Sequence, residues 1–470
     1  MNTDNANFID IEDEQGRRYH LHKKPIGVGG QGKVCISDDG KYVVKFLNSN
    51  SPQARSKLTT KLRRVKRLPI ENLPIAKPLS MLPRPHVGYV MEFFADMISL
   101  KKMMIPPKGS DVLEHYVATG GLVRRLEILG RFARVFSQLH ARSIAFSDLS
   151  PNNLFVSENA EYREVRLIDV DNLFITSQAG EAVYTPGYGA PELVKNSGLP
   201  STLSDAYSFA VLAFELLTLN HPLKGDVVIN GEPEIEEGAL KGELPWIEHP
   251  EVDINRCSTG IPTEYVISPK LLKAFDTTFN SGLNAAEQRT SMNKWVELLD
   301  LAADNTLYCT TCGSTYYRNQ DICPWCDEDS VPAFMIGYIF HYDPSLKEKF
   351  RELRQGKDEN LSKDFLRTLN TIGTVSFQEN TSRSIERRTA FLDTSIRSYD
   401  EVATIEIKSE RITIRPIEET SLWVSRDDLE EYKSVEERGI RMQPGNILHF
   451  QDASKPHVMI YFRVGRGAKK

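Results

Sequence analysis

The chain has 470 residues, of which 40% are hydrophobic and 26% are charged, and its formal net charge is −6. These values indicate a soluble globular protein of roughly two to four domains, because single hydrophobic cores stop growing well below this length. The acidic balance argues against nucleic acid or an anionic membrane as a general partner, and no segment approaches the roughly 20 apolar residues of a membrane span. The polar N-terminus lacks a secretion signal, so we expect a cytoplasmic protein with a flexible acidic tail at residues 1–18.

The first motif is glycine-rich. Gly27, Gly29 and Gly32 have the spacing G-x-G-x-x-G, and Val34 follows them. Glycines at this spacing allow a tight hairpin whose backbone N–H groups can approach a phosphate, although a plain hairpin turn has the same pattern. Residues 42–47 then read as a strand that is apolar except for Lys45. A lysine on a buried strand is costly unless it meets an anion, and a nucleotide phosphate is a natural partner.

Residues 53–68 are predicted to form a helix that is rich in lysine and arginine and has no acidic residue. This basic face is either solvated or a docking surface for an acidic partner. Residues 88–94 then read as a strand that ends in Glu92 and two aromatic residues. Residues 122–142 have apolar side chains at helical spacing, which predicts a core helix.

Asp148 and Asn153 follow that helix on one short loop, and the apolar run 165–168 then leads to Asp169. One aspartate together with an Asn–Asp pair can hold magnesium on a nucleotide and orient a hydroxyl beside it. Residues 184–192 read Tyr-Thr-Pro-Gly-Tyr-Gly-Ala-Pro-Glu. The order of these strings is more specific than any one of them.

Together the strings resemble a protein kinase over about residues 20–303, and the Ala-Pro-Glu string at 190–192 is the most specific. The resemblance implies an α+β, two-lobed fold with an N-lobe at 19–94 and a C-lobe at 95–303. It implies that Asp148 orients the acceptor hydroxyl, that Asn153 and Asp169 bind Mg²⁺, and that Thr185 contacts Asp148. The ATP site would consist of Gly27, Gly29, Gly32, Val34, Val43, Lys45, Met91, Glu92, Phe94 and Phe155.

Two further residues resemble structural positions of the family. Asp205, near the start of the predicted buried helix 203–218, resembles the residue that braces the backbone of the catalytic loop. A buried aspartate needs hydrogen-bond donors, which that backbone would supply. Arg289 resembles the arginine that pairs with the glutamate of Ala-Pro-Glu, which is Glu192 here. We therefore expect a buried Glu192–Arg289 ion pair.

The chain also departs from the family. The helix at 53–68 lacks the glutamate that would pair with Lys45, so another carboxylate such as Asp169 serves or this pair is absent. Phe146-Ser147 stands where kinases carry His-Arg, which removes the usual receptor for an activation-loop phosphate, and we expect activity without such phosphorylation.

Two more departures lie beside the metal-binding residues. Ser150 replaces a lysine that supports the transferring phosphate, and we expect a lower rate. Val170-Asp171 replaces Phe-Gly, which predicts a stiffer segment. Asp171 is expected to have a surface or turn role, with help to the metal as the alternative.

Four cysteines form two C-x-x-C pairs separated by ten residues. Four thiolates at this spacing predict a closed, structural Zn²⁺ site in a zinc ribbon at 306–328. The metal would supply most of the folding energy of such a small module. The ligands would be Cys309, Cys312, Cys323 and Cys326.

The rest of the chain carries no clear chemistry. We expect a linker with a strand and a helix at 333–400 and a small, mainly-β domain at 401–466, because short alternating segments are separated by glycine and proline turns. The pattern faintly resembles a forkhead-associated sandwich, but a phosphothreonine-binding set of side chains is not evident, and an adaptor domain is the other reading.

The resemblance favours a bacterial-type Ser/Thr protein kinase that uses ATP and Mg²⁺, with a structural Zn²⁺. The alternative is a pseudokinase, a nucleotide-binding scaffold for partner assembly, which the missing family residues favour. A third class, a zinc-dependent nucleic-acid binder, is disfavoured by the negative charge. The layout also resembles kinases that bacteria encode beside a metal-dependent phosphatase and a von Willebrand-type partner, so these are expected partners besides a protein substrate.

Overall fold

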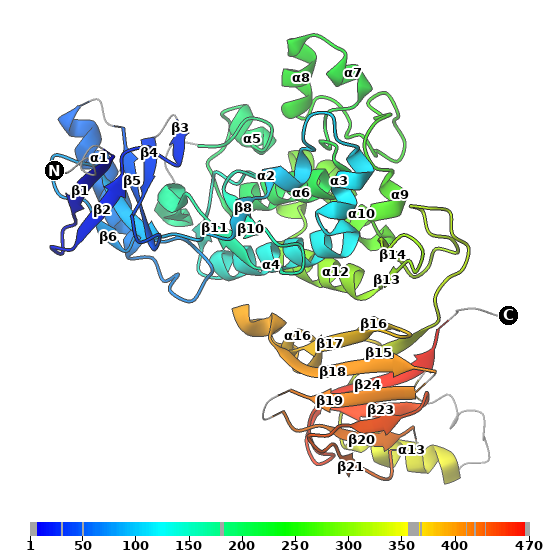
Figure 1. Ribbon diagram of the computed structural model, residues 1–470. Coiled ribbons are helices and arrows are strands. Elements are labelled where there is room, and N and C mark those ends of the chain that lie inside the picture. Colours follow the sequence, from blue (N-terminus) through cyan, green and yellow to red (C-terminus); the bar gives the residue numbers. More distant parts are fainter. Residues whose placement is uncertain are drawn as a thin grey trace. The chain divides into compact units, whose positions relative to one another are not determined.

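The computed structural model describes residues 7–29, 32–48, 51–178, 183–355, 366, 369–409, 411–417, 420–427 and 429–465. The chain divides into two compact units, whose elements are labelled in Figure 1. The first unit comprises residues 1–120, 131–261 and 273–294, and the second comprises 121–130, 262–272 and 295–470. Within the described ranges, no helix is both long and apolar enough to cross a membrane.

The first unit begins with a β-hairpin of β1 (Phe8–Glu12) and β2 (Arg18–His22), where the sequence suggests a flexible tail. The segment looks polar because only alternate residues of β2 are buried: Tyr19 and Leu21 point into the core and their neighbours are exposed or half-buried. The Tyr19 hydroxyl also donates a hydrogen bond to the buried Asp13, at 3.0 Å. The hairpin is therefore part of the folded unit from Phe8 onward.

A five-stranded antiparallel sheet follows, in the order β3-β4-β5-β7-β6. Its two faces are covered by different elements, because successive strand residues point to opposite sides. Val44 of β5 packs with Leu21 of the hairpin, whereas Val43 packs with Leu62 of helix α1 (Pro52–Lys66). The strands are β3 (Gly27–Gly29), β4 (Gly32–Ile36), β5 (Tyr42–Leu47), β6 (Ser80–Met81) and β7 (Gly88–Glu92).

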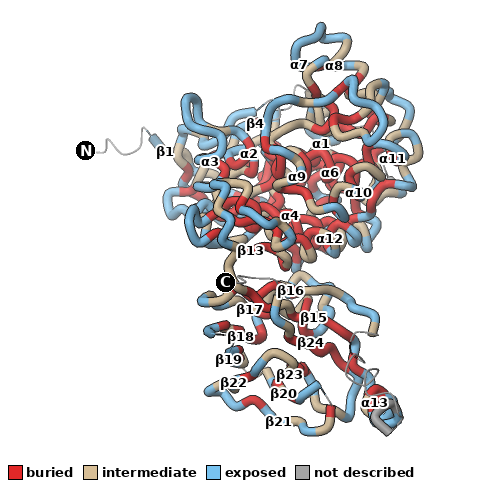
Figure 2. The backbone as a smooth tube through the Cα atoms, turned by 90° about the vertical axis from the view of Figure 1, so that its right-hand side faces the viewer, coloured by how far each residue is buried: buried red, intermediate tan, exposed pale blue. Residues whose placement is uncertain are grey.

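The chain is mainly helical between β7 and β13 (Thr306–Tyr308). Helix α6 (Thr202–Thr218) is buried from Ser204 to Thr218 apart from Glu215, and Figure 2 shows it as a red segment of the tube. Helix α4 (Gly121–His140) is also largely buried. The other helices are α2 (Lys101–Met104), α3 (Val112–Ala118), α5 (Pro191–Val194), α7 (Asp226–Ile229), α8 (Pro233–Leu240), α9 (Thr263–Val266), α10 (Pro269–Phe279), α11 (Ser281–Asn284) and α12 (Met292–Asp304).

Short strands carry the candidate site. Strand β10 (Leu154–Ser157) lies between β11 (Val165–Leu167) and β8 (Met97–Ser99), and β9 (Ile144–Ala145) pairs with β12 (Phe174–Ile175). The loop from β9 to β10 contains Asp148 and Asn153, and Asp169 follows β11 directly before the 3-10 turn η2 (Val170–Asn172). The hairpin β10–β11 thus brings the predicted catalytic loop and Asp169 to the same end of one small sheet.

The second unit contains a two-stranded ribbon, β13 (Thr306–Tyr308) with β14 (Thr315–Tyr317), and two larger sheets. The six-stranded sheet has the order β16-β15-β24-β23-β20-β21, and the four-stranded sheet has the order β17-β18-β19-β22. One apolar core contains residues from both sheets, among them Phe377 and Ile460 of the first and Ile405 and Ile412 of the second. The two sheets therefore pack face to face as a sandwich.

The sandwich starts earlier than the sequence pattern suggests. Strand β15 (Phe334–Tyr342) pairs along its whole length with the final strand, β24 (His457–Val464), and with β16 (Gly373–Gln378). The strands at 334–342, 373–378 and 382–386, within the stretch that reads as a linker, therefore belong to the sandwich. The remaining elements are helices α13 (Ser345–Gln355) and α16 (Arg387–Ala390), and strands β17 (Ser382–Glu386), β18 (Glu401–Lys408), β19 (Arg411–Pro416), β20 (Trp423–Arg426), β21 (Lys433–Ser434), β22 (Ile440–Met442) and β23 (Asn446–His449).

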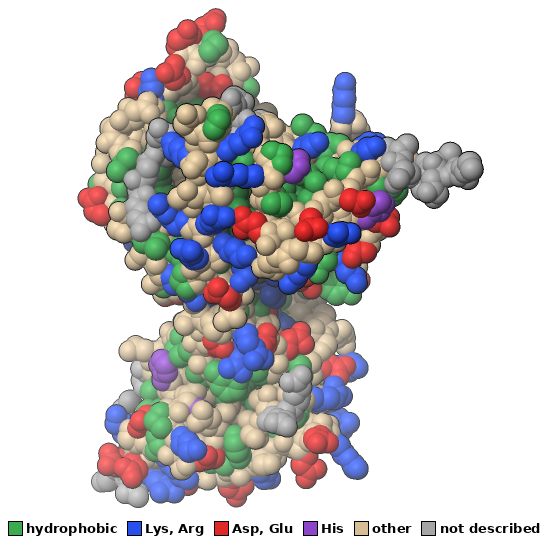
Figure 3. Space-filling model, turned by 90° about the vertical axis from the view of Figure 1, so that its left-hand side faces the viewer, with side chains coloured by type: hydrophobic (Ala, Val, Ile, Leu, Met, Phe, Trp, Pro, Cys, Tyr) green, Lys and Arg blue, Asp and Glu red, His purple; other side chains and the backbone are tan. Residues whose placement is uncertain are grey.

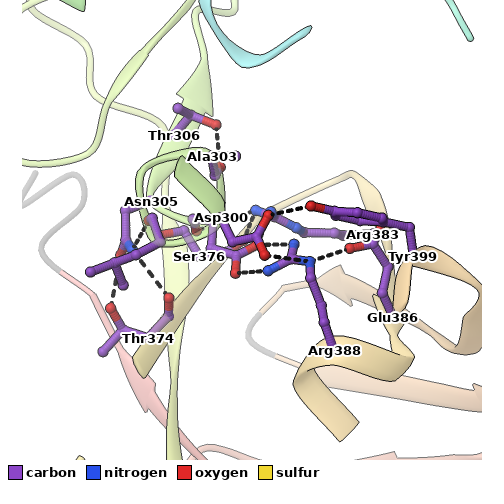
Figure 4. Close-up of polar contacts among 12 residues, drawn as sticks. Asp300, Ala303, Asn305, Thr306, Thr374, Ser376, Arg383, Glu386, Arg388 and Tyr399 are labelled. Carbon is purple, nitrogen blue, oxygen red and sulfur yellow. Dashed lines mark hydrogen bonds and ion pairs between the residues drawn. The ribbon is translucent and has the colours of Figure 1, made fainter. Parts of the chain in front are cut away.

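An ion-pair network joins the end of α12 to the sandwich within the second unit (Figure 4). Asp304 accepts hydrogen bonds from Arg383 at 2.8 Å and from both terminal nitrogens of Arg388 at 2.7 and 2.9 Å. Asp300, one turn earlier, accepts from the hydroxyl of Tyr399 at 3.0 Å. Because Asp304 is buried and has its charge compensated by two arginines, its pKa is lowered although burial alone would raise it.

Candidate active site

In the predicted catalytic loop, Asp148 is held by neighbours from two segments. The Thr185 hydroxyl donates a hydrogen bond to Asp148 Oδ1 at 2.7 Å, and Asn153 Nδ2 donates to the backbone carbonyl of Asp148 at 2.8 Å. Asn153 is buried, whereas Asp148 is only half-buried. Its second carboxylate oxygen can thus meet an incoming hydroxyl, while the first is fixed by Thr185.

Asp205 braces this loop from α6. Its carboxylate accepts hydrogen bonds from the backbone N–H of Phe146 at 2.7 Å and of Ser147 at 2.9 Å. Ser147 has φ of 71°, a left-handed conformation that is unfavourable for a residue with a side chain, so the loop needs such an anchor. His140, at the end of α4, also contacts Asp205, with 3.2 Å between Nε2 and Oδ2. The sequence predicts the role of Asp205 but gives no sign of His140.

Lys45 of β5 reaches two carboxylates in this structure. Its ammonium group contacts Asp169 Oδ1 and donates a hydrogen bond to Asp171 Oδ2 at 2.7 Å. The side chains of Lys45 and Asp171 are 8% and 7% exposed, whereas that of Asp169 is 27% exposed. Burial alone would lower the pKa of Lys45, but the negative charges of Asp171 and Asp169 outweigh it, and the pKa is raised.

These contacts correct the expected role of Asp171. Asp171 was expected in a surface or turn role, but it is a buried partner of Lys45. The structure also shows that helix α1 contributes a cation to this region, since Lys61 Nζ donates a hydrogen bond to Asn172 Oδ1 at 2.6 Å. The available signal was the sequence Asp-Val-Asp at 169–171 combined with a helix that has no acid at all.

Four other basic side chains of α1 are exposed, as a solvated helix face predicts, and Lys66 is half-buried; the four are Arg55, Lys57, Arg63 and Arg64. Arg63 forms an ion pair with Glu14 at 2.7 Å. Figure 3 shows lysine and arginine side chains gathered over the first unit on the face turned to the viewer, with acidic side chains among them. The mixed charge favours the solvated reading of this helix over a docking surface for an acidic partner.

The predicted nucleotide-binding residues come from the two sheets that flank the active site. Val34, Val43, Met91 and Phe94 belong to one apolar cluster. Glu92 ends β7 and is exposed, and Phe155 lies on β10 opposite Ser99. The glycine-rich hairpin is formed by β3 and β4, with Gly27 paired to Val34 and Gly29 to Gly32, and residues 30–31 at its tip lie outside the described residues.

Gly32 is required for packing as well as for the turn. A Cβ atom on Gly32 would lie 1.9 Å from the carbonyl oxygen of Phe46 on the neighbouring strand, which no side chain can tolerate. Gly27 and Gly29 have open space at the same position. The hairpin can therefore lie close to β5, the strand that carries Lys45.

The segment at 184–192 is tied to helix α6. The Tyr188 hydroxyl donates a hydrogen bond to Glu215 at 2.5 Å, and the Ser208 hydroxyl donates to the backbone carbonyl of Tyr188 at 2.7 Å. Burial and the charge of Glu215 raise the pKa of Tyr188, so its phenol remains protonated and acts as a donor. Residues 179–182 of the activation segment lie outside the described residues.

The four predicted zinc ligands come together. The Sγ atoms of Cys309, Cys312, Cys323 and Cys326 all lie within 4.8 Å of one another. Sγ of Cys309 is 3.6 Å from that of Cys326, and Sγ of Cys312 is 3.8 Å from that of Cys323. A tetrahedral Zn²⁺ with Zn–S bonds of about 2.3 Å requires S–S separations of about 3.8 Å.

Both C-x-x-C turns have the same backbone form. The N–H of Gly313 bonds to the carbonyl of Cys309, and the N–H of Asp327 bonds to that of Cys323, both at 2.9 Å. Gly313 and Asp327 both have left-handed φ values, 71° and 57°. These paired turns aim the thiols at one point, so the donor set fits a tetrahedral metal ion.

Comparison with known proteins agrees with this geometry. Residues 19–252 match the family model described as the protein kinase domain. The serine/threonine-protein kinases pkn2 and Pkn1 of Myxococcus xanthus are both 27% identical to this chain, over 222 and 216 residues, which are 44% and 43% of it. A probable serine/threonine-protein kinase of Dictyostelium discoideum is 28% identical over 230 residues, or 47% of the chain.

The chain spans only a part of each of these relatives: 25% of pkn2, 29% of Pkn1 and 16% of the Dictyostelium protein. The similarity is therefore limited to one domain and gives no information about the other parts of those proteins. The matched segment holds the glycine-rich hairpin, Lys45, the catalytic loop and Asp169. The similarity to the protein kinase domain therefore covers residues 19–252, just under half of the chain.

Proposed function

We propose that the protein transfers the γ-phosphate of ATP to serine or threonine hydroxyl groups of proteins. The observation that carries the proposal is the set of contacts around Asp148: Thr185 holds one oxygen of this carboxylate, Asn153 holds its backbone, and the other oxygen is left for an acceptor. A carboxylate held in this way can orient a hydroxyl and accept its hydrogen bond, which is the role of the loop aspartate in kinases.

Asn153 and Asp169 are the residues that would hold Mg²⁺. An amide oxygen and a carboxylate are ligands that this ion prefers, and the ion would neutralise charge on the ATP phosphates. Lys45 would bind the phosphates from the side of β5. The contact between Lys45 and Asp169 would then be replaced, because Lys45 would bind the phosphates and Asp169 would bind the metal ion.

The alternative is a nucleotide-binding scaffold without transfer activity. The observation that favours it is the contact between Lys45 and Asp169, which joins the phosphate-binding cation to the metal-binding carboxylate. Against it stands the retention of Asp148, whose contact with Thr185 has no use in a site that only binds nucleotide.

Incubation with radiolabelled ATP and Mg²⁺ separates the two functions. We expect autophosphorylation on serine or threonine that falls by about 10²–10⁴-fold or more in Asp148→Ala and is lost in Asp169→Ala. Asp253→Asn, on the exposed surface, is the matched control and should keep full activity. Bound ATP without any transfer by the wild type would assign the scaffold function.

We further propose that the four cysteines hold a structural Zn²⁺, because no ligand position remains open for chemistry. A ribbon of this kind would present a rigid surface to a partner. A metal-dependent phosphatase and a von Willebrand-type protein remain the proposed partners besides the protein substrate, on resemblance alone. The cytoplasm remains the proposed location.

A further inference from the structure

We propose that Asp171 is the residue that positions Lys45, and that Lys61 of helix α1 supports Asp171 from the opposite side. In the kinase family, a glutamate of the helix pairs with this lysine. In this chain the helix supplies a cation, Lys61, and the segment after Asp169 supplies the carboxylate, Asp171. The inference rests on the proposed kinase function and adds to it a positioning residue.

The turn after β11 places Asp171 and Asn172 beside two lysines. Asp169 has φ of 56°, and the 3-10 turn η2 follows it at once. This turn directs Asp171 to Lys45, at 2.7 Å, and the next residue, Asn172, to Lys61, at 2.6 Å. Two neighbouring residues of one short turn therefore engage one lysine from β5 and one from α1.

Asp169 and Asp171 differ in how far their side chains are buried. Asp171 is 7% exposed, whereas Asp169 is 27% exposed. Asp169 is therefore the more accessible of the two carboxylates to a metal ion. Asp171 is almost completely covered, so its bond to Lys45 can persist when Asp169 binds the metal ion.

The charges of the side chains in this region balance. Two carboxylates, Asp169 and Asp171, face two ammonium groups, Lys45 and Lys61. Burial lowers the pKa of Lys61, and among the charges that oppose this effect the largest is that of Asp171. The other oxygen of Asp171, Oδ1, is buried and has no hydrogen-bond partner among the residues that the structure describes. An acceptor is thus left on the carboxylate that binds Lys45 and whose negative charge also acts on Lys61.

A helix glutamate would not fit this arrangement. A third carboxylate beside Asp169 and Asp171 would leave one negative charge uncompensated in a buried site, which is unfavourable. A lysine at position 61 compensates Asp171 instead. Asp171 therefore takes the place of the carboxylate that α1 lacks. Lys45 is oriented by Asp171, without help from a helix carboxylate.

Steady-state kinetics of four variants tests this role. Asp171→Asn should raise the KM for ATP and lower kcat/KM by at least tenfold, whereas Asp171→Glu should recover a part of the loss. In the decisive variant, Lys61→Glu is combined with Asp171→Asn, which moves the carboxylate to the helix. We expect this double variant to exceed Asp171→Asn in kcat/KM, although Lys61→Glu alone is impaired.

The controls are Lys66→Glu, which makes the same charge change elsewhere on α1, and Asp253→Asn. Neither should recover or reduce activity. An unchanged KM and kcat in Asp171→Asn would overturn the proposal, and so would a double variant no better than Asp171→Asn. A change confined to the Mg²⁺ concentration at half-maximal rate would assign Asp171 to the metal and would overturn it too.

A second measurement needs no activity and separates this inference from the proposed function. The measurement is the melting temperature of wild type, Lys45→Met, Asp171→Asn and the double variant. The loss of melting temperature in the double variant should be smaller than the sum of the losses in the two single variants. Additive losses would overturn the pairing. Coupled losses in a protein that transfers no phosphate would retain the pairing and reject the kinase function.

Discussion

Arg289 and Glu192 form a two-pronged ion pair across 97 residues of sequence: Nη1 donates to Oε1 and Nη2 donates to Oε2, both at 2.8 Å. The Arg289 side chain is 1% exposed, and it also donates hydrogen bonds to the carbonyls of Gly282 and Leu203. The pair confirms the one predicted from the sequence. It fastens the end of the activation segment to the helices that follow.

Breaking this pair should destabilise the first unit. Glu192→Ala leaves a buried guanidinium without its anion, and we expect a loss of about 3–5 kcal/mol in the free energy of unfolding. The double variant with Arg289→Met should lose less than the two single variants together. Urea denaturation measures all four proteins, and a loss below about 1 kcal/mol in Glu192→Ala would contradict a tightly buried pair.

The same pair predicts a pH dependence. Burial alone would raise the pKa of Glu192, but its hydrogen bonds and charge interaction with Arg289 lower it below 4.5. A carboxylate with a lowered pKa in the folded state contributes stability above its unfolded pKa, and this contribution is lost as the pH falls through the folded value. Wild type should therefore lose more stability than Glu192→Gln below pH 4.5, as acid denaturation would show.

Asp205 should matter for turnover more than for nucleotide binding. Asp205→Ala removes the acceptor of two buried backbone N–H groups, at Phe146 and Ser147, which costs about 1–3 kcal/mol for each group left unsatisfied. Because the left-handed Ser147 directly precedes Asp148, we expect kcat to fall by tenfold or more. Asp205→Asn keeps one oxygen acceptor and should fall less. Calorimetry should show a nearly unchanged ATP affinity, and an affinity loss equal to the kcat loss would refute the assignment.

Removing the metal should unfold the ribbon. Elemental analysis of protein purified without chelator should give one zinc per chain, and Cys312→Ser should give much less than one. Cys257→Ser is the control, because Cys257 lies outside the cluster and its loss should leave the metal content unchanged. Chelation should expose residues 306–328 to limited proteolysis. A cysteine-intact protein that carries no zinc would rule out the site.

The sandwich contains a buried chain of hydrogen bonds that predicts sensitivity to acid. The carbonyl of Lys455 can only accept, so His457 Nδ1 donates to it at 2.7 Å, and His457 Nε2 is left to accept from His449 Nδ1 at 2.9 Å. His449 Nε2 lies 2.9 Å from the Ser425 hydroxyl, which also lies 2.9 Å from the carbonyl oxygen of Arg426. Both imidazoles are neutral in this chain. Burial and the neighbouring His457 lower the pKa of His449 to about 3, and burial lowers that of His457.

A histidine with a lowered folded pKa stabilises the fold above its unfolded value of 6.5, and this contribution is lost as the pH falls toward the folded value. The sandwich should therefore lose up to about 1.4 kcal/mol per pH unit from His449 in the window between pH 6.5 and 3. Hydrogen exchange of β23 and β24, corrected for the intrinsic rate, measures this loss. His449→Gln should flatten the dependence, whereas His341→Gln, at an exposed position in the same sheet, should not. An equally steep dependence in both variants would contradict the assignment.

The sequence by itself determined the features that short stretches encode. The glycine spacing, Asp148 with Asn153, Asp169 and the Ala-Pro-Glu string each lie within a few residues, as do the two C-x-x-C pairs, because the chemistry needs those groups at fixed local spacing. The residue types also set the chemistry: carboxylates and an amide for Mg²⁺, and four thiolates for Zn²⁺. These patterns predicted the similarity to the protein kinase domain that the comparisons find over residues 19–252.

Only the tertiary structure decided which distant groups meet. Lys45 and Asp171 are 126 residues apart, and Lys61 and Asn172 are 111 apart, so no local pattern joins them. The sandwich likewise begins at β15 because that strand pairs with β24 at the far end of the chain. Periodicity shows that a segment is a strand but not which strand it joins, since pairing depends on how the whole chain buries its apolar faces.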